Sequence, residues 1–277
     1  MRTIVHLSDL HFGRVDHATT QPLVRQIKAI QPHLVVVSGD LTQRARKEQF
    51  QEAGRFLESL PKPQIVIPGN HDVPAYNLFK RFLTPLKRYR QYVTDELLPH
   101  YIDDELAVFG LNSTRSFTTQ YGRLREKDIA RVCEKLGQLP EGVTKIVACH
   151  HPFDLPLKHT QRDLIRSAES AMRAFADCCV DIILSGHLHR SHTSHAAQRY
   201  RIQGHKALIV QAGTAISNRR RSETNSFNVL RIGDANLIVE RLTWNVKDSS
   251  YTLSKAEEFT RTTEGWSPAK AKSDVLP

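Results

Sequence analysis

The sequence has no long apolar run. No stretch approaches the ~20 consecutive apolar residues that a membrane-spanning helix needs. The first apolar run covers residues 4–7 and leads directly into Asp9, which is unlike the apolar segment of a signal peptide. We therefore expect a cytoplasmic protein without a membrane span. The oligomeric state stays open, because apolar edge strands pair within or between chains alike.

Cysteine is also scarce, since the chain has only four. No two of them have the C-x-x-C spacing that is typical of zinc or redox sites. Two are adjacent in a helical pattern, where neighbouring thiols are poorly placed to bridge each other. We predict that all four are reduced packing residues, namely Cys133, Cys149, Cys178 and Cys179.

What the sequence does contain is an excess of basic charge. With 277 residues, 40% of them hydrophobic and 25% charged, the chain is long enough for one large globular domain. A net charge of +10 and a pI near 9.6 indicate an anionic partner. That partner is either a phosphorylated small-molecule substrate or nucleic acid, and charge alone does not choose between them.

The first half of the chain alternates between strand and helix patterns. Apolar runs predict strands at 3–7, 34–38 and 64–67, and apolar periodicity predicts helices at 21–30 and 47–60. Pro22 would then lie in the first turn of the earlier helix. This βαβαβ order predicts parallel strands with right-handed crossovers, and therefore an α/β fold.

The alternation is interrupted at 74–104 by two short helical patterns rich in basic and aromatic residues. They form either a rim or lid insertion over a site, or an exposed pair of amphipathic helices. Strands follow at 106–111, 145–149 and 181–184, with helices at 126–138 and 163–179. Later strands at 207–211, 227–232 and 237–242 lack helices between them, which predicts an antiparallel set. We expect the main domain at 1–242 and a polar C-terminal extension at 243–277.

Polar residues of metal-binding types follow five of these apolar strands. Ligands of open α/β sheets bind at the carboxyl ends of the strands, so we expect these side chains to meet. The candidate metal ligands are Asp9, His11, Asp40, Asn70, His150, His187 and His189. A carboxylate among them can bridge two ions, which suits a pair of divalent metals holding a hydroxide for in-line attack on a phosphoryl group.

The types of ligand restrict the metal. Mixed imidazole and carboxylate ligands suit manganese, iron, zinc, cobalt or nickel, and the sequence does not rank them. No thiolate is among the candidates, which disfavours a structural zinc site of the finger kind. His71 follows Asn70 directly and so lies beside the metals. Because imidazole exchanges a proton near neutral pH, we hypothesise that His71 is the general acid that protonates the leaving group.

These motifs have the order and approximate spacing found in the calcineurin-like metallophosphoesterase superfamily, which the chain resembles over about residues 1–240. The resemblance implies a catalytic domain of two packed mixed β-sheets flanked by helices, a four-layer αββα fold. It implies a first metal site of Asp9, His11, Asp40 and His189, and a second of Asp40, Asn70, His150 and His187. His150 is chosen over His151 because the family's ligand histidine typically lies two residues before a proline, here Pro152.

Differences between this sequence and three branches of the superfamily narrow the range of possible activities. Asp72 stands where serine/threonine protein phosphatases have glutamate, Gln43 where purple acid phosphatases have a tyrosine ligand, and His71 where lipid A precursor hydrolases usually have arginine. What remains resembles the bacterial phosphodiesterase branch. We predict a dinuclear phosphodiesterase acting on a small nucleotide-type substrate, with a 3′,5′-cyclic nucleotide as the leading candidate. The alternatives are a DNA repair-type nuclease and a non-catalytic scaffold with the same fold.

Further polar residues are weaker candidates for substrate contacts. His151 lies beside a ligand or lines the substrate pocket, and either Arg115 or Arg123, in the segment after the strand at 106–111, contacts the substrate. The basic run at 219–221 either binds phosphate or is a solvated loop, and we favour the solvated loop. The remaining histidines His192, His195 and His205 are expected to be ordinary.

Overall fold

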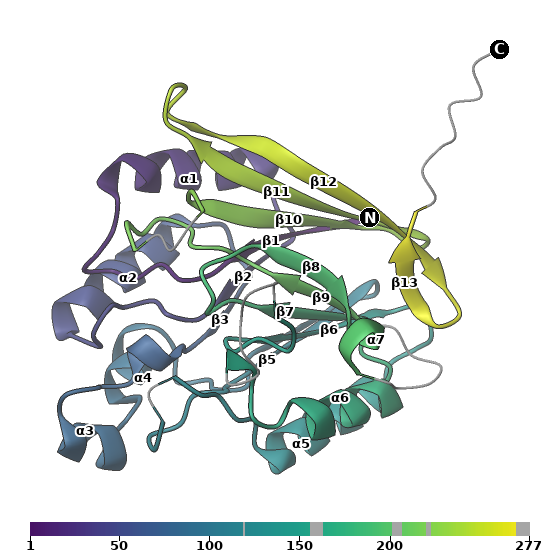
Figure 1. The fold of residues 1–277 in the computed structure, drawn as a ribbon, viewed down its shortest axis with the longest axis horizontal. Helices are drawn as coiled ribbons and strands as arrows, with labels where there is room; N and C mark the ends of the chain where they lie inside the picture. Colours follow the sequence, from purple (N-terminus) through teal and green to yellow (C-terminus); the bar gives the residue numbers. More distant parts are fainter. Residues whose placement is uncertain (119, 156–162, 201–206, 220–222, 270–277) are drawn as a thin grey trace.

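The structure, a computed structural model, describes residues 1–118, 120–155, 163–200, 207–219 and 223–269. Two mixed β-sheets pack face to face, and helices cover their outer surfaces (Figure 1). This arrangement confirms the predicted four-layer α/β fold. Within the described residues, no helix is both long and apolar enough to cross a membrane.

The first sheet has the strand order β13-β12-β11-β10-β1-β2-β3. Its strands are β1 (Arg2–Leu7), β2 (Leu34–Ser38), β3 (Gln64–Ile67), β10 (Ser226–Ile232), β11 (Asn236–Asn245), β12 (Ser250–Thr262) and β13 (Gly265–Pro268). The strands β1, β2 and β3 are parallel, as predicted, and β10 to β13 continue the sheet in antiparallel order.

The second sheet has the order β4-β5-β6-β7-β9-β8. Its strands are β4 (His100–Ile102), β5 (Leu106–Leu111), β6 (Thr144–Cys149), β7 (Ile182–Ser185), β8 (His192–His195) and β9 (Leu208–Gln211). The four inner strands are parallel, and the edge strands β4 and β8 are antiparallel to their neighbours. The prediction of an antiparallel set from 207 onward was therefore wrong for β9, which pairs in parallel with β7.

The helices are α1 (His17–Ile30), α2 (Lys47–Ser59), α3 (Leu78–Leu83), α4 (Lys87–Tyr92), α5 (Glu126–Gly137), α6 (Ala168–Asp177) and α7 (Ala196–Arg199). Helix α1 begins four residues before the predicted start, because the Asp16 side chain caps it by accepting a hydrogen bond from the Ala18 backbone N–H. Pro22 is therefore inside the helix rather than in its first turn.

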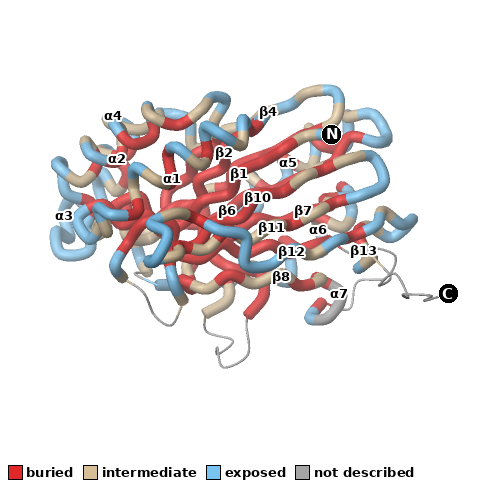
Figure 2. The backbone as a smooth tube through the Cα atoms, turned by 90° about the horizontal axis from the view of Figure 1, so that it is seen from above, coloured by how far each residue is buried: buried red, intermediate tan, exposed pale blue. Residues whose placement is uncertain are grey.

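The parallel strands of the first sheet are buried on both faces. Alternate side chains such as Ile4 and Val36 face the second sheet, whereas Val5 and Val37 pack against α1 and α2. Figure 2 shows the strands buried along most of their length, while exposed residues gather on helices and connections. Continuous apolar runs in the sequence are the signature of such doubly covered strands.

The predicted boundary at 242 was wrong. It falls inside β11, and the next strands β12 and β13 belong to the same sheet. Phe259 and Trp266, from the predicted extension, are buried in the core between the sheets. Up to residue 269, this part of the chain forms the edge of the first sheet and belongs to the fold.

The expectation that all four cysteines are reduced was also wrong. Cys133 of α5 and Cys178, which caps α6, form a disulfide. Cys149 and Cys179 are free. The two helices lie side by side on the second sheet (Figure 1), which brings together thiols that are 45 residues apart in sequence.

Candidate metal centre

All seven predicted ligands follow the carboxyl ends of parallel strands. In the first sheet, Asp9 and His11 follow β1, Asp40 follows β2, and Asn70 opens a short 3-10 helix η1 (Asn70–Asp72) after β3. In the second sheet, His150 follows β6, and His187 and His189 follow β7. The site therefore lies where the two sheets present their parallel strand ends to each other.

The backbone at these strand ends is strained. Among the described residues, nine non-glycine residues have a positive φ, and five of them are predicted ligands. These five are Asp9, His11, Asp40, His187 and His189. Such left-handed conformations cost about 1–3 kcal/mol each and persist where the surrounding fold requires them. The turn before Asp40 needs glycine for two reasons. Gly39 has a φ of +97°, and a Cβ at this position would lie 2.6 Å from His150 Nδ1.

The first cluster consists of Asp9, His11 and His189, all buried. The Nε2 atoms of the two histidines lie 3.4 Å apart. They are 3.6 Å and 3.5 Å from Asp9 Oδ1. That oxygen is buried and accepts no hydrogen bond from any described residue. A buried carboxylate oxygen that accepts no hydrogen bond and faces two imidazole nitrogens forms an arrangement that suits a divalent cation.

The second cluster consists of Asp40, His150 and His187, with Asn70 beside them. The Asn70 Oδ1 atom lies 3.1 Å from His150 Nε2 and 3.0 Å from His187 Nδ1. The two histidine nitrogens are 3.2 Å apart. Oxygen and imidazole nitrogen atoms again converge on one point, so these four residues suit a second cation.

Asp40 connects the clusters. Its Oδ1 atom lies 3.4 Å from His150 Nε2, and its Oδ2 atom lies 3.7 Å from His11 Nε2. Each carboxylate oxygen thus faces a histidine of a different cluster. This is the position that a carboxylate shared by two metal ions occupies.

The protonation states of Asp40, His187 and His189 also suit cations. Burial would raise the pKa of Asp40, but the neighbouring His150 and His71 hold it well below its usual range. Burial and the adjacent His150 lower the pKa of His187 to about 3, and burial lowers that of His189 to about 4. Burial would likewise lower the pKa of His150, but Asp40 outweighs it and raises the value to about 9. An ionised carboxylate and neutral imidazoles are the forms that bind metal, so His150 has to release its proton when an ion binds.

Residues behind the clusters orient the ligands. His150 Nδ1 donates to the Ser38 carbonyl at 2.8 Å, which turns Nε2 toward the cluster. His189 Nδ1 is hydrogen-bonded to Thr214 Oγ1 at 2.7 Å. Such contacts fix the ring and the tautomer of a ligand histidine. Thr214 was not a predicted site residue, although it follows β9, so the rule on strand ends could have identified it.

Asp72 was also missed as a structural element of the site. Its carboxylate accepts hydrogen bonds from the backbone N–H groups of Leu41, Thr42 and Gly69, at 3.1, 2.8 and 2.9 Å. It thereby ties the turn that carries Asp40 to the turn that carries Asn70 and His71. The sequence shows the aspartate, but its backbone partners Leu41 and Thr42, which are 31 and 30 residues away, become evident only in three dimensions.

His71 lies beside the first cluster, with its ring centroid 5.0 Å from that of His11. Its backbone N–H donates to Asp40 Oδ1 at 2.8 Å, and its Nδ1 donates to the Gln43 carbonyl at 2.8 Å. Arg219 Nη1 donates to the remaining ring nitrogen, Nε2, at 2.6 Å. Burial lowers the pKa of His71, and Asp40 offsets this only in part.

This contact corrects our expectation for the basic run. Arg219 was expected in a solvated loop, yet it reaches the side chain predicted to be the general acid. The arginines at 220 and 221 lie outside the described residues, as does His205. His192 and His195 are described, and neither belongs to the two clusters.

The predicted substrate contacts lie apart from the clusters or behind them. His151 is buried, bonded through Nδ1 to Ser113 Oγ at 2.7 Å, and its ring packs 5.0 Å from that of His150 and 4.7 Å from that of His187. It therefore supports two predicted ligands. Arg115 and Arg123 line cavities beside the site.

The sequence is similar to those of two bacterial phosphodiesterases. The chain is 31% identical over 185 residues to the glycerophosphodiester phosphodiesterase GpdQ of Enterobacter lignolyticus, covering 62% of this chain and 64% of that protein. It is 26% identical over 204 residues to the 3′,5′-cyclic adenosine monophosphate phosphodiesterase CpdA of Escherichia coli, covering 68% of this chain and 69% of that one. The chain thus spans slightly less than two-thirds of GpdQ.

Solved structures share the fold. A purple acid phosphatase from yellow lupin (Lupinus luteus) seeds superposes with a TM-score of 0.70 at 12% identity, over 93% of this chain and 53% of that one. A dimetal phosphatase from Danio rerio superposes with a TM-score of 0.60 at 12% identity, over 87% and 95%.

A family model described as calcineurin-like phosphoesterase matches residues 2–191, which include all seven predicted ligands. Together with the two clusters, this match identifies a dinuclear site for divalent metals. The chain belongs to the calcineurin-like phosphoesterase family.

Proposed function

We propose that the protein is a metal-dependent phosphodiesterase. The observation that carries the proposal is the position of Asp40, whose two oxygens face histidines of different clusters. Asp9, His11, Asp40 and His189 would hold one ion, and Asp40, Asn70, His150 and His187 the other. Manganese, iron and zinc all suit these ligands. Two such ions, when bound, would lower the pKa of a water molecule for attack and offset charge on the phosphoryl oxygens.

The protein's own residues would position the substrate and handle the proton. We propose that His71 Nε2 exchanges its hydrogen bond from Arg219 for a proton and then donates that proton to the departing alkoxide, while Gln43 holds Nδ1 and fixes the ring. Arg219, which contacts that same nitrogen, is placed to pair with a phosphoryl oxygen next to it. His151 would keep the rings of His150 and His187 in place.

The substrate that we propose is a small nucleotide-type phosphodiester, with a 3′,5′-cyclic nucleotide as the first candidate. The support is the likeness to CpdA, whose name states this activity. The likeness to GpdQ makes a glycerophosphodiester the second candidate. A non-catalytic scaffold is disfavoured because the chain keeps every ligand type at both clusters.

The test compares bis-p-nitrophenyl phosphate, a diester, with p-nitrophenyl phosphate, a monoester, in added manganese. We expect turnover of the diester and loss of that turnover in Asp40→Asn. Asp234→Asn, an exposed aspartate with the same change, serves as the control. No turnover with manganese, iron or zinc would favour the scaffold, and preference for the monoester would refute the diesterase.

The role of His71 has its own test. General acid catalysis contributes roughly 10²–10⁴-fold, but only where the leaving group needs a proton. We expect His71→Ala to slow hydrolysis of an alkyl diester by about that factor, and to slow bis-p-nitrophenyl phosphate far less because p-nitrophenolate leaves unprotonated. Equal losses on the two substrates would exclude the general acid role.

A further inference from the structure

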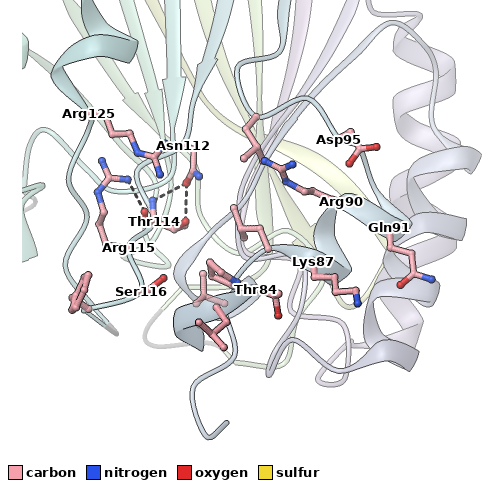
Figure 3. Close-up of a pocket in the computed structure, with 16 residues that line it drawn as sticks. Thr84, Lys87, Arg90, Gln91, Asp95, Asn112, Thr114, Arg115, Ser116 and Arg125 are labelled. Carbon is pink, nitrogen blue, oxygen red and sulfur yellow. Dashed lines mark hydrogen bonds between the residues drawn. The ribbon is translucent and has the colours of Figure 1, made fainter. Parts of the chain in front are cut away.

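A large cavity lies beside the metal centre. It has a volume of about 970 Å³ and is bounded by α4 on one side and by the segment after β5 on the other (Figure 3). Val73, two residues after His71, lines it. Asn112 and Thr114 also line it, and Ser113 between them is bonded to His151. None of the seven ligands lines the cavity, but two of the chain segments in its walls lead directly to residues beside the clusters.

The walls of this cavity are basic. Lys87 and Arg90 lie on one side, and Arg115 and Arg125 lie on the opposite side (Figure 3). Among the described residues that line it, Asp95 is the one acidic residue. None of the four cations forms an ion pair with a described residue. Burial lowers the pKa of Arg115, and the neighbouring Arg125 adds to this by repulsion. An anion would relieve that repulsion.

The basic lining continues into a second cavity of about 490 Å³. Arg115 and Arg125 belong to both cavities, and the second adds Arg123 and Arg166 together with the acidic Glu126. A single phosphate group needs one or two guanidinium partners. Cations distributed over two adjoining cavities fit a ligand that carries several phosphates in a row.

An aromatic side chain stands where the two cavities meet. Phe117 lines both of them and is 88% exposed. Its ring centroid is 5.3 Å from that of Phe82 on α3. The buried Arg81, next to Phe82, holds the two together, because it donates hydrogen bonds to the backbone carbonyls of Ser116 and Thr118 on either side of Phe117. An exposed ring in a fixed place next to basic side chains is suited to stacking against a base.

We propose that these two cavities bind a single-stranded oligonucleotide, with its backbone along the basic walls and a base against Phe117. One phosphodiester of the strand then reaches the metal centre. This inference rests on the proposed phosphodiesterase function and adds a substrate class to it. A cyclic nucleotide carries one phosphate and would leave the cavity cations without partners. A strand carries the row of phosphates that pairs them.

The binding test uses the full chain with manganese and a fluorescein-labelled oligothymidylate of about eight nucleotides with phosphorothioate linkages, which resist hydrolysis. Its dissociation constant is measured by anisotropy over a range of salt concentrations. Each phosphate contact in a single strand adds about 0.7 to the slope of log K against log salt. We expect Arg115→Ala and Arg125→Ala each to weaken binding about tenfold and to lower the slope by about 0.7.

A matched control is Arg131→Ala, which removes the same charge from an exposed position of α5 that lines neither cavity. We expect this control to change the affinity by less than about twofold and the slope by less than about 0.2. Loss of affinity without a change in slope for the two cavity variants would indicate a purely structural role and would overturn the proposal.

Phe117→Ala tests the stacking contact. Stacking on an aromatic side chain is worth roughly 1–3 kcal/mol per base, so we expect binding to weaken at least about fivefold. The control is Leu253→Ala, another exposed apolar residue, on β12. Binding of phosphatidylglycerol vesicles in place of the oligonucleotide would overturn the proposal, because it would make Phe117 a membrane contact.

The oligonucleotide site and the phosphodiesterase activity can be refuted separately. Turnover of bis-p-nitrophenyl phosphate without binding of the oligonucleotide would overturn only the oligonucleotide site. Binding of the oligonucleotide without turnover of any diester would refute the phosphodiesterase and would leave a nucleic-acid-binding protein.

Discussion

Removing the buried tryptophan of β13 tests whether the C-terminal strands belong to the fold. Trp266 has 0% of its surface exposed and packs with Phe259 in the core between the sheets. The guanidinium of Arg261 lies 4.6 Å from its ring centroid. If residues 243–268 were a loosely attached extension, Trp266→Ala would leave the free energy of unfolding of the main domain unchanged.

The expected loss follows from the environment of the ring. A buried tryptophan removes about 150–250 Å² from water, which at about 25 cal/mol per Å² stabilises the fold by roughly 4–6 kcal/mol. The contact with Arg261 adds about 1 kcal/mol. Against this, Trp266 Nε1 has no acceptor among the described residues, and its removal relieves about 1–3 kcal/mol. We therefore expect Trp266→Ala to lower the free energy of unfolding by about 3–5 kcal/mol, the range seen for such substitutions.

The measurement is urea denaturation followed by circular dichroism. Leu253→Ala, at a 58% exposed position of β12, is the control and should change stability by less than about 0.5 kcal/mol. Trp266→Phe keeps most of the apolar bulk and removes the unpaired N–H, so it should cost less than half as much as the alanine change. A loss below about 1 kcal/mol for Trp266→Ala would refute the reasoning.

Two further predictions concern the site and its surroundings. Gly39→Ala should lower the amount of manganese bound per chain, because its Cβ would displace His150. The control is Gly142→Ala, at a position with a similar φ of +95° and open space around it. It should lower the free energy of unfolding by only about 1–2 kcal/mol and leave metal binding unchanged. Burial would raise the pKa of Asp154, but hydrogen bonds from neighbouring side chains hold it below its usual value. Its contribution to stability is present above about pH 4 and lost as the pH falls further, so Asp154→Asn should destabilise the protein at pH 7, with the difference from the wild type closing in acid.

The strand ends were predictable because the sequence repeats one pattern. Buried parallel strands appear as continuous apolar runs, and ligand-type residues directly after them have no role in a core. The positions of Asp9, Asp40 and His187 at the carboxyl ends of strands follow from that rule alone. The partition of strands between two sheets does not, because the sequence does not say whether β9 continues the parallel sheet or joins the late antiparallel strands.

Two of the misses share one cause, which is that the deciding contact is distant in sequence, whereas a third arose from composition. Cys133 and Cys178 meet only because α5 and α6 pack together. The strand β12 was overlooked because only Tyr251 and Phe259 are buried among its 13 residues, so its composition is that of a polar tail. The approach of Arg219 to His71 joins residues 148 positions apart.

The metal centre also joins the two sheets. Asp9 and His11 follow a strand of the first sheet, while His189 in the same cluster follows a strand of the second. Likewise, Asp40 belongs to the first sheet and His150 to the second. A ligand that binds only the folded state adds about 2.7 kcal/mol of stability at 100 times its dissociation constant. Ions bound between the sheets would thus offset part of the free-energy cost of the left-handed backbone conformations. They would also offset the repulsion between the carboxylates of Asp9 and Asp40. Binding of metal and packing of the two sheets therefore stabilise each other, and any change that separates the strand ends should weaken both.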